Sequence, residues 1–289
     1  MKDYILITDN TCDLDDSYYS EHNIPVTVLP YSINDVVYGI DKSMSLPDFY
    51  NAMRDKIMPT TMACNPDSYS TTFEKYLCEG KDVIHLAFSS ALSSSYGNAI
   101  LAADELIEKY PDRQIKIIDS LCASCGEGLL LYRAVREMEN GATFDELVNF
   151  IEDNKMKICH YFTVDDLNHL YRGGRVSKST AVVGSIINIK PILHVDNEGH
   201  LIPVGNSRGR KKSLLTLVDY MEKITADYEG DNDVVMISHG DCEEDAKFVA
   251  SEIKKRFGTK EVIISYVSQT IGAHAGPGVI SIFFMGNHR

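Results

Sequence analysis

The stretch Asp82–Asp119 reads DVIHLAFSSALSSSYGNAILAADELIEKYPDRQIKIID, and its pattern decides the fold class. Two apolar runs, Asp82–Phe88 and Gln114–Asp119, are typical of buried strands, and Ser94–Tyr110 between them has helical spacing. Parallel strands that are covered on both faces are apolar along their whole length. This strand–helix–strand unit therefore predicts an α/β fold with a mostly parallel sheet.

The same alternation extends to both sides of this stretch. Towards the N-terminus, strands are predicted at Tyr4–Thr8 and Pro25–Leu29, a hairpin at Tyr31–Ile40, and helices at Leu46–Lys56 and Asp67–Leu77. Towards the C-terminus, a helix is predicted at Ala123–Glu139. Thr143 and Glu146 then form a capping-box pattern that starts another helix.

The second half of the chain has a different rhythm. Strands are predicted at Ile158–Val164, Lys190–Val195, Leu201–Val204, Val234–His239, Val262–Ser268 and Val279–Met285. Helices are expected directly after Arg175, at Gly209–Tyr228 and at Glu243–Phe257, and a hairpin turn at Asn197–Gly199 adds an antiparallel pair to a mixed sheet. We predict two α/β domains, residues 1–155 and 156–289. Since no Pro/Gly linker separates them, we expect the two domains to pack closely.

The composition excludes several classes of function. The 289 residues carry a net charge of −14, which disfavours nucleic acid and anionic membrane as the main partner. No apolar run approaches the length of a membrane helix and no secretory signal opens the chain, so we expect a cytoplasmic protein. The seven cysteines suggest neither a disulfide framework nor a metal site, and Cys122 and Cys125 are interpreted as small buried hydrophobes rather than a redox pair.

Two hydroxyl-rich loops are candidate binding sites. Five serines occur in the seven residues 89–95, between a predicted strand and a predicted helix. These serines can cap the helix or donate to an anion at its N-terminus. Thr60 and Thr61 offer hydroxyls from a second loop, where the alternative is an ordinary turn.

Cationic and imidazole groups complete the candidate site. Arg172 and Arg175 flank Gly173 and Gly174, and two guanidinium groups around a flexible turn suit a carboxylate or phosphate. His274 lies among the small residues 272–278, which can hold it against a ligand. The basic cluster Arg208, Arg210, Lys211 and Lys212 can dock an acidic partner or simply begin a solvated helix.

Taken together, these motifs resemble the DegV family of bacterial fatty-acid-binding proteins. ITDNTCDL (residues 7–14) is similar to the family's ITDST-x-DL, and SSALSSSYGNA (89–99) is similar to SSGLSGTYQSA. Four more segments match the family pattern in the same order along the chain: PTT (59–61), IDSLCASCGEGLL (118–130), the Tyr161–Lys212 block and GAHAGPG (272–278). The chain departs from the family pattern at Asn10, Met62-Ala63, Ser94-Ser95 and Ala275.

The resemblance implies a fold and a function. It implies a long-chain fatty acid, such as palmitate, stearate or oleate, buried between two α/β domains, with no cofactor. By the same resemblance Thr61 and Ser93 bind its carboxylate, and Arg172 and His274 complete the polar network. Supporting roles fall to Thr60, Ser89, Ser90, Ser94, Gly173 and Gly174. A partner kinase subunit that forms acyl phosphate would dock near Arg175, Arg208, Arg210, Lys211 and Lys212, and this chain itself would not be an enzyme.

Two other functions remain open on the residues alone. Ser93 and His274 could form a serine hydrolase site, although the chain has no GxSxG motif. His274 could instead accept a phosphoryl group.

Overall fold

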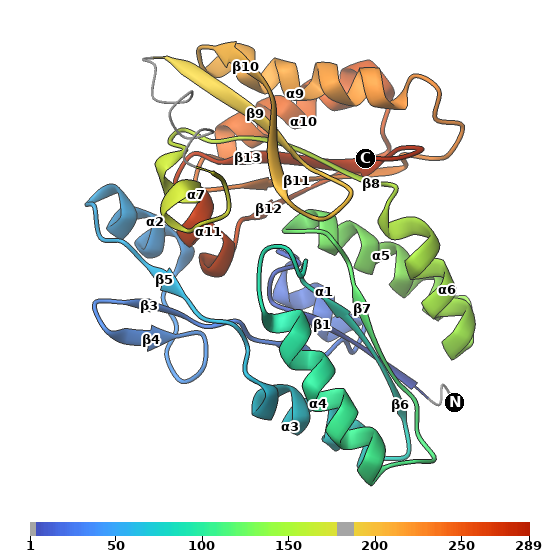
Figure 1. Ribbon diagram of the computed structural model, residues 1–289. Helices are drawn as coiled ribbons and strands as arrows, with labels where there is room; N and C mark the ends of the chain where they lie inside the picture. Colours follow the sequence, from blue (N-terminus) through green and yellow to red (C-terminus); the bar gives the residue numbers. More distant parts are fainter. Residues whose placement is uncertain (1–3, 178–187) are drawn as a thin grey trace.

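The protein is described from a computed structural model that covers residues 4–177 and 188–289. The described chain forms two main β-sheets with helices around them, and a small third sheet lies beside the first (Figure 1). The apolar helix predicted directly after Arg175 falls largely in residues 178–187, outside the described residues.

The first sheet is fully parallel. It contains β1 (Tyr4–Asp9), β2 (Val26–Thr27), β6 (Asp82–Ala87) and β7 (Ile115–Asp119) in the order β2-β1-β6-β7. Alternate residues of each strand point to opposite faces, so Ile7 and Val83 pack under α3 (Pro66–Cys78) and α4 (Ser95–Lys109). Leu6 and Ile84 pack against α5 (Cys125–Glu139) and α6 (Phe144–Lys155) on the other face.

The second sheet is mixed. It contains β8 (Ile158–Thr163), β9 (Ile189–Val195), β10 (Leu201–Arg208), β11 (Val234–His239), β12 (Glu261–Tyr266) and β13 (Ile280–Met285). Their order is β10-β9-β8-β13-β11-β12, and every neighbouring pair is antiparallel except β11 and β12. Helices α9 (Arg210–Thr225) and α10 (Glu243–Phe257) cover its outer face (Figure 1).

Helix α5 lies between the two sheets. Its apolar residues share one buried cluster with strand residues of the first sheet and with Met236 and Phe283 of the second. This arrangement confirms the predicted α/β class with a parallel first sheet and a mixed second sheet. The predicted boundary at residues 155/156 falls between α6 and β8 and stays a prediction.

Short elements around the junction carry most of the polar candidates. The third sheet, β4-β3-β5, comprises β3 (Tyr31–Ile33), β4 (Val36–Tyr38) and β5 (Thr60–Thr61), and α2 (Leu46–Arg54) packs beside it. The predicted hairpin turn is present, because Asn34 and Asp35 both have positive φ, as a tight two-residue turn requires. Helices α1 (Asp16–Glu21), α7 (Asn168–Arg172) and α11 (Gln269–Ala275) were not predicted from the sequence.

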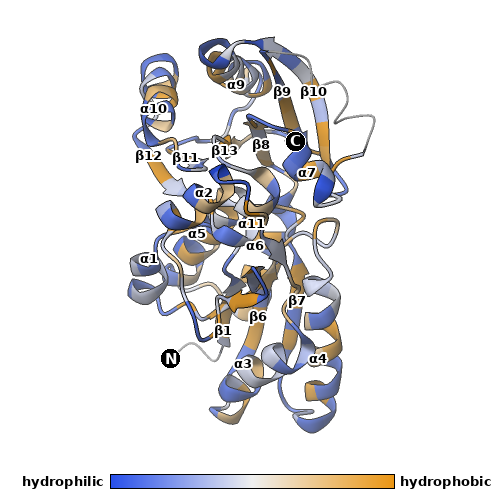
Figure 2. Cartoon of the chain, turned by 90° about the vertical axis from the view of Figure 1, so that its left-hand side faces the viewer, coloured by the Kyte–Doolittle hydropathy of each residue, from blue (hydrophilic) through white to orange (hydrophobic). Residues whose placement is uncertain are grey.

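The helices are amphipathic. Figure 2 shows hydrophilic and hydrophobic residues mixed along outer helices such as α4 and α10, as expected for helices that cover a sheet on one side only. None of the helices in the described parts of the chain combines the length and the apolarity needed to cross a membrane.

Candidate functional site

A cavity of about 270 Å³ lies between the two main sheets. Most of its wall is aliphatic or aromatic, and both halves of the chain contribute to it. Leu29 and Phe88 come from loops next to the first sheet, whereas Phe162 and Phe283 come from β8 and β13 of the second. The remaining apolar lining includes Leu92, Leu170, Val195, Leu201, Val267, Ile271 and Val279.

Polar side chains also line this cavity, and two of them are in direct contact. The Thr61 Oγ1 atom lies 2.8 Å from His274 Nε2, although the two residues are 213 positions apart. Thr61 is held on β5, which pairs with Tyr31 of β3, and His274 lies in the last turn of α11. Ser93, Ser94 and Arg175 line the same cavity.

His274 is a neutral imidazole at neutral pH. Burial, followed by the nearby charge of Arg175, lowers the pKa of His274 to about 4. Its Nδ1 atom is buried and has no hydrogen-bond partner among the described residues. A bare lone pair is cheaper to leave unpaired than an N–H group, so the proton belongs on Nε2, which then donates to Thr61. The hydroxyl proton of Thr61 is therefore free to point at a ligand.

Gly173 makes the position of His274 possible. A Cβ atom at residue 173 would lie 2.0 Å from His274 Nδ1, far inside van der Waals contact. The missing side chain lets the turn after α7 pass directly over the imidazole. Gly174 has φ +75°, and in the described parts of the chain nothing beyond its two neighbours lies within 4 Å of where its Cβ would stand.

The two arginines of this turn lie in different places. Arg175 lines the cavity, and its guanidinium donates to Leu92 O (3.0 Å from Nε and 2.7 Å from Nη2) and to Gly173 O. Arg172 is exposed, contacts His169 Nδ1 at 2.9 Å, and is not among the residues that line the cavity. Among the described residues, the cation that lines the cavity beside the polar side chains is Arg175, whereas the family resemblance assigned this position to Arg172.

The serine-rich loop divides into a cavity side and a scaffold side. Ser93 lines the cavity, and its Oγ lies 2.9 Å from Ser95 Oγ. Ser89 is buried and donates to Gly199 O, and the backbone N–H of the exposed Ser90 donates to Asp119. Thr60 is exposed and its hydroxyl contacts Ser32, so Thr60, Ser89 and Ser90 are not among the cavity-lining residues.

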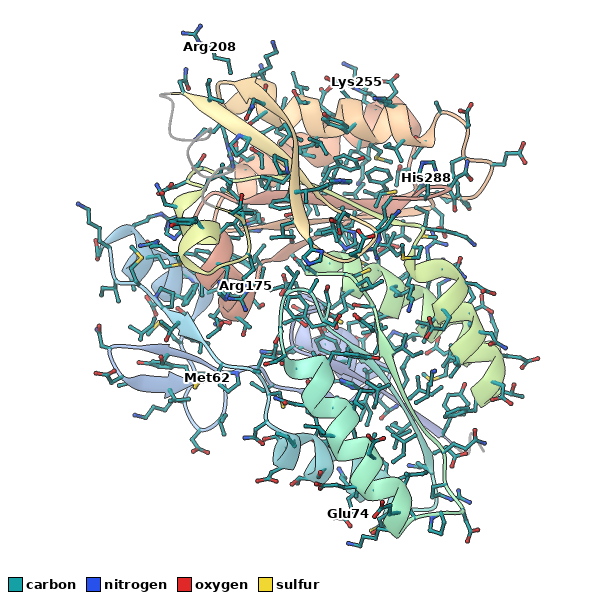
Figure 3. All side chains as sticks on the ribbon, in the orientation of Figure 1. Met62, Glu74, Arg175, Arg208, Lys255 and His288 are labelled. Carbon is teal, nitrogen blue, oxygen red and sulfur yellow. The ribbon has the colours of Figure 1, made fainter. Side chains whose placement is uncertain are left out.

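The basic cluster lies away from this cavity. Arg210 is bound to Asp245 at 2.8 Å, and Lys211 lies over the Phe248 ring. Arg208 and Lys212 are exposed, and Figure 3 shows Arg208 at the outer edge of the second sheet, whereas Arg175 lies near the junction of the sheets.

Several site residues escaped the sequence reasoning. Met62 and Ala63 line the cavity directly after Thr61. Ser124 and His160 line it as well. His160 lies on β8, whose mostly apolar sequence predicts a buried strand and gives no sign of a binding residue. The serine-rich run 89–95 was predicted to be a binding loop because of its many hydroxyl groups, but nothing in the sequence distinguished Ser95 from the other serines.

A second groove, of about 800 Å³, runs along β12 and α1. Its described lining includes Asp15, Asp16 and Glu261 but neither lysine nor arginine, so it does not suit an anionic ligand. The described cysteines are free, and no described group of His, Cys, Asp and Glu side chains has the geometry of a metal site.

A Ser93–His274 catalytic pair is not formed among the described contacts. Ser93 Oγ is engaged with Ser95, and His274 Nε2 is engaged with Thr61. The other ring nitrogen, Nδ1, contacts no carboxylate from residues 4–177 or 188–289 that could orient the ring. The geometry therefore does not favour a serine hydrolase.

Comparison with known proteins identifies the family. The model of the "uncharacterised protein, DegV family" matches residues 4–287. A DegV domain-containing protein of Clostridium perfringens is 40% identical, with 100% of this chain and 99% of that protein covered.

Two solved structures are similar over almost the whole chain. A DegV family protein from Ruminococcus gnavus, described with vaccenic acid, has a TM-score of 0.87 and 26% identity over 98% of this chain and 100% of that one. A stearic-acid-binding protein from Eubacterium ventriosum has a TM-score of 0.87 and 25% identity over 98% of each chain. The order of the sequence motifs, the two sheets and the full-length match agree, and the chain belongs to the DegV family.

Proposed function

We propose that this protein binds a long-chain fatty acid in the cavity between its two sheets. The observation that carries the proposal is an apolar cavity that also presents Thr61, Ser93, Arg175 and His274. The bound acids described for the relatives from R. gnavus and E. ventriosum support the same class of ligand.

The energetics favour an amphiphile with an anionic head. Each buried CH₂ group contributes ~0.8 kcal/mol, so a chain of 16 to 18 carbons contributes on the order of 10 kcal/mol before entropic costs. A buried carboxylate without hydrogen bonds would cancel much of this gain. In the proposed complex Thr61 and Ser93 donate to the carboxylate, and Arg175 supplies the compensating charge.

We further propose that the chain acts as a carrier in the cytoplasm rather than as an enzyme. It would present the carboxylate to an ATP-dependent kinase subunit that forms acyl phosphate. The exposed cations Arg208, Lys211 and Lys212 are the proposed docking surface, and their charge suits an acidic partner. Replacing all three with alanine should reduce acyl-phosphate formation by the paired kinase while leaving oleate affinity unchanged.

Mass spectrometry of the purified protein tests the binding proposal. We expect a bound C16–C18 acid in the native spectrum that disappears after solvent extraction. The extracted protein should rebind palmitate, and Thr61→Val or Ser93→Ala should each weaken that binding about tenfold, the loss of one hydrogen bond to a charged group. Thr60→Val is the matched control, because Thr60 is exposed and does not line the cavity. A protein that rebinds neither palmitate nor oleate would overturn the proposal.

A further inference from the structure

Ser95 is a buried polar residue directly behind the ligand-facing Ser93. It is the first residue of α4 and is fully buried. Its Oγ atom lies 2.9 Å from Ser93 Oγ, and its backbone N–H donates to the same Ser93 oxygen at 3.2 Å. Ser95 does not line the cavity, so it does not contact a ligand there itself.

Ser95 also joins the two hydroxyl-bearing loops. The backbone N–H of Cys64, three residues after Thr61, donates to Ser95 Oγ at 3.1 Å. The Asn98 side chain on α4 donates to Cys64 O at 2.8 Å. These two bonds attach the Thr61 loop to the helix that follows Ser93.

Behind Ser95 lies an ionised carboxylate. Asp9 is fully buried, and burial by itself acts to raise its pKa. The charge of His85 and hydrogen bonds from Thr27 and the Phe88 backbone outweigh that effect, so the pKa of Asp9 is lowered. As an anion Asp9 can only accept, so the Tyr69 hydroxyl, 2.9 Å away, must donate its proton to Asp9.

Because Tyr69 donates its own proton to Asp9, two acceptors remain for the hydroxyl proton of Ser95, namely the Tyr69 oxygen and the Ser93 oxygen. The Tyr69 oxygen is left as an acceptor, and the Ser95 hydroxyl acts on it as a donor does, in the direction that lowers the pKa of Tyr69. Ser95 has a single hydroxyl proton, which can go either to Tyr69 or to Ser93. When Ser95 donates to Ser93, the Ser93 oxygen receives two donors, the O–H and the N–H of Ser95. The proton of Ser93 must then point elsewhere, and the cavity is the open direction.

We propose that Ser95 is a positioning residue that directs the hydroxyl proton of Ser93 towards the anionic head of the ligand. Tyr69, held by Asp9, is the competing acceptor that takes the Ser95 proton when the cavity holds no anion. A carboxylate in the cavity draws the Ser93 proton to itself, and the Ser95 proton turns to Ser93 in response. This inference rests on the proposed function, because it requires a carboxylate ligand.

The test compares palmitate with 1-hexadecanol, which has the same chain length and no charge. Both ligands are titrated into delipidated wild type, Ser95→Ala and Ser95→Thr. We expect Ser95→Ala to weaken palmitate binding about tenfold and hexadecanol binding less than twofold, because only the anion depends on the direction of the Ser93 proton. Ser95→Thr keeps a hydroxyl and should restore palmitate binding.

Two further variants separate positioning from general support of the fold. In Ser93→Ala/Ser95→Ala, palmitate binding should be no weaker than in Ser93→Ala alone, because Ser95 acts through Ser93. Tyr69→Phe removes the competing acceptor, so palmitate affinity should stay the same or rise, even though thermal stability falls.

The possible results have distinct meanings. Equal loss of both ligands in Ser95→Ala, additive losses in the double variant, or weaker palmitate binding in Tyr69→Phe would each overturn the inference. If Ser95→Ala does not fold, the Tyr69→Phe result decides it. Failure of wild type to bind palmitate would instead contradict the proposed function.

Discussion

Gly173 shows how a single missing side chain can determine a binding site. A methyl group there would meet His274 Nδ1 at 2.0 Å, and the ring has little room to retreat because Thr61 holds its other nitrogen. We expect Gly173→Ala to displace the imidazole and weaken palmitate binding at least tenfold, as measured by calorimetric titration.

The matched control is Gly97→Ala on α4. Apart from the adjacent residues and the backbone of α4 itself, no described atom lies within 4 Å of the added methyl group, so binding should be unchanged. Stability should rise by about 0.5–1 kcal/mol, because alanine is the better helix former. Unchanged binding in Gly173→Ala would show that the position of His274 does not matter for the ligand.

His274 should give the unliganded protein a pH-dependent stability. Its pKa is about 4 in the folded protein, because of burial and the charge of Arg175, against about 6.5 when unfolded. The unfolded chain therefore binds the proton first as the pH falls. The stabilising contribution is complete above pH 6.5 and is lost as the pH falls to about 4, by on the order of 3 kcal/mol.

Urea unfolding of the delipidated protein at several pH values measures this effect. The difference between wild type and His274→Gln isolates it from the contributions of other histidines. That difference should shrink between pH 6.5 and pH 4, and a constant difference would contradict the predicted shift. Bound palmitate should reduce the slope, because an anion beside the ring favours its protonation.

The sequence predicted the arginine pair Arg172 and Arg175 but not which of the two faces the cavity. The motif alone predicted two guanidinium groups around a flexible turn, and both are there. Which of them faces the cavity depends on where α7 ends and on the turn through Gly173 and Gly174. The motif does not reveal the end of α7 or the path of the turn. The family resemblance therefore assigned the cavity position to Arg172, whereas Arg175 lines the cavity.

At the scale of elements, the long regular pieces were predictable and the short ones were not. Strand β11 and helix α10 have the predicted bounds, and the Thr143–Glu146 capping box starts α6 as expected. Helices α7 and α11 have only five and seven residues, too few to show a hydrophobic period. Because α11 carries His274 and α7 leads into Arg175, the less predictable elements are the ones that build the polar part of the site.

Helix α5 packs so closely against β8 that residue 126 has no room for a side chain. Gly126 lies in its first turn, and a Cβ atom there would lie 2.0 Å from His160 Nε2 on β8. That nitrogen accepts from Ala123 N–H at 3.3 Å, and Nδ1 of the same ring contacts Ile158 O. We expect Gly126→Ala to destabilise the protein by about 2–4 kcal/mol, opposite in sign to most helical glycine replacements.

Thermal unfolding of Gly126→Ala beside Gly97→Ala measures this contrast. The two changes add the same methyl group to a helix, so their difference reports the space at each position. A stabilised Gly126→Ala would mean that α5 can move away from β8 at little cost. Because His160 also lines the cavity, such movement would alter the cavity wall.

In the molecule as a whole, the buried carboxyl group of Asp13 links residues from both halves of the chain. Asp13, in the loop after β1, accepts from Ser124 Oγ at 2.5 Å and from the Ser268 backbone N–H at 3.0 Å. Ser124 Oγ also lies 2.8 Å from Ser238 Oγ on β11, so the contact joins both halves of the chain. Ser124 has φ 56° and ψ −146°, a conformation that a residue other than glycine keeps only when its surroundings enforce it.

The sequence predicted that the two halves pack closely but not which residue joins them. Asp13 belongs to the ITDNTCDL motif, which is recognisable without any indication of what its second aspartate contacts. Its partners lie 111 and 255 positions away. No local pattern encodes contacts at such separations, which is also why the Thr61–His274 contact could not be derived from the residues.

Asp13 should make the protein less stable as the pH rises. Burial raises the pKa of its carboxyl to about 7, against hydrogen bonds from Ser124 and Ser268 that act in the opposite direction. The unfolded carboxyl ionises near pH 4 while the folded one keeps its proton. Stability therefore falls from about pH 4 to about pH 7, by up to ~1.4 kcal/mol per pH unit.

Asp13→Asn keeps the shape and cannot ionise, and its amide can accept from the Ser268 N–H through the oxygen and donate to Ser124 Oγ through the nitrogen. Its urea midpoint should equal that of wild type near pH 4 and exceed it at pH 8, whereas Asp112→Asn, at an exposed loop carboxyl, should follow wild type throughout. A lower midpoint for Asp13→Asn at pH 8 would show that the ionised carboxylate itself holds the sheets together. In that case acid, rather than base, would loosen the junction that encloses the cavity.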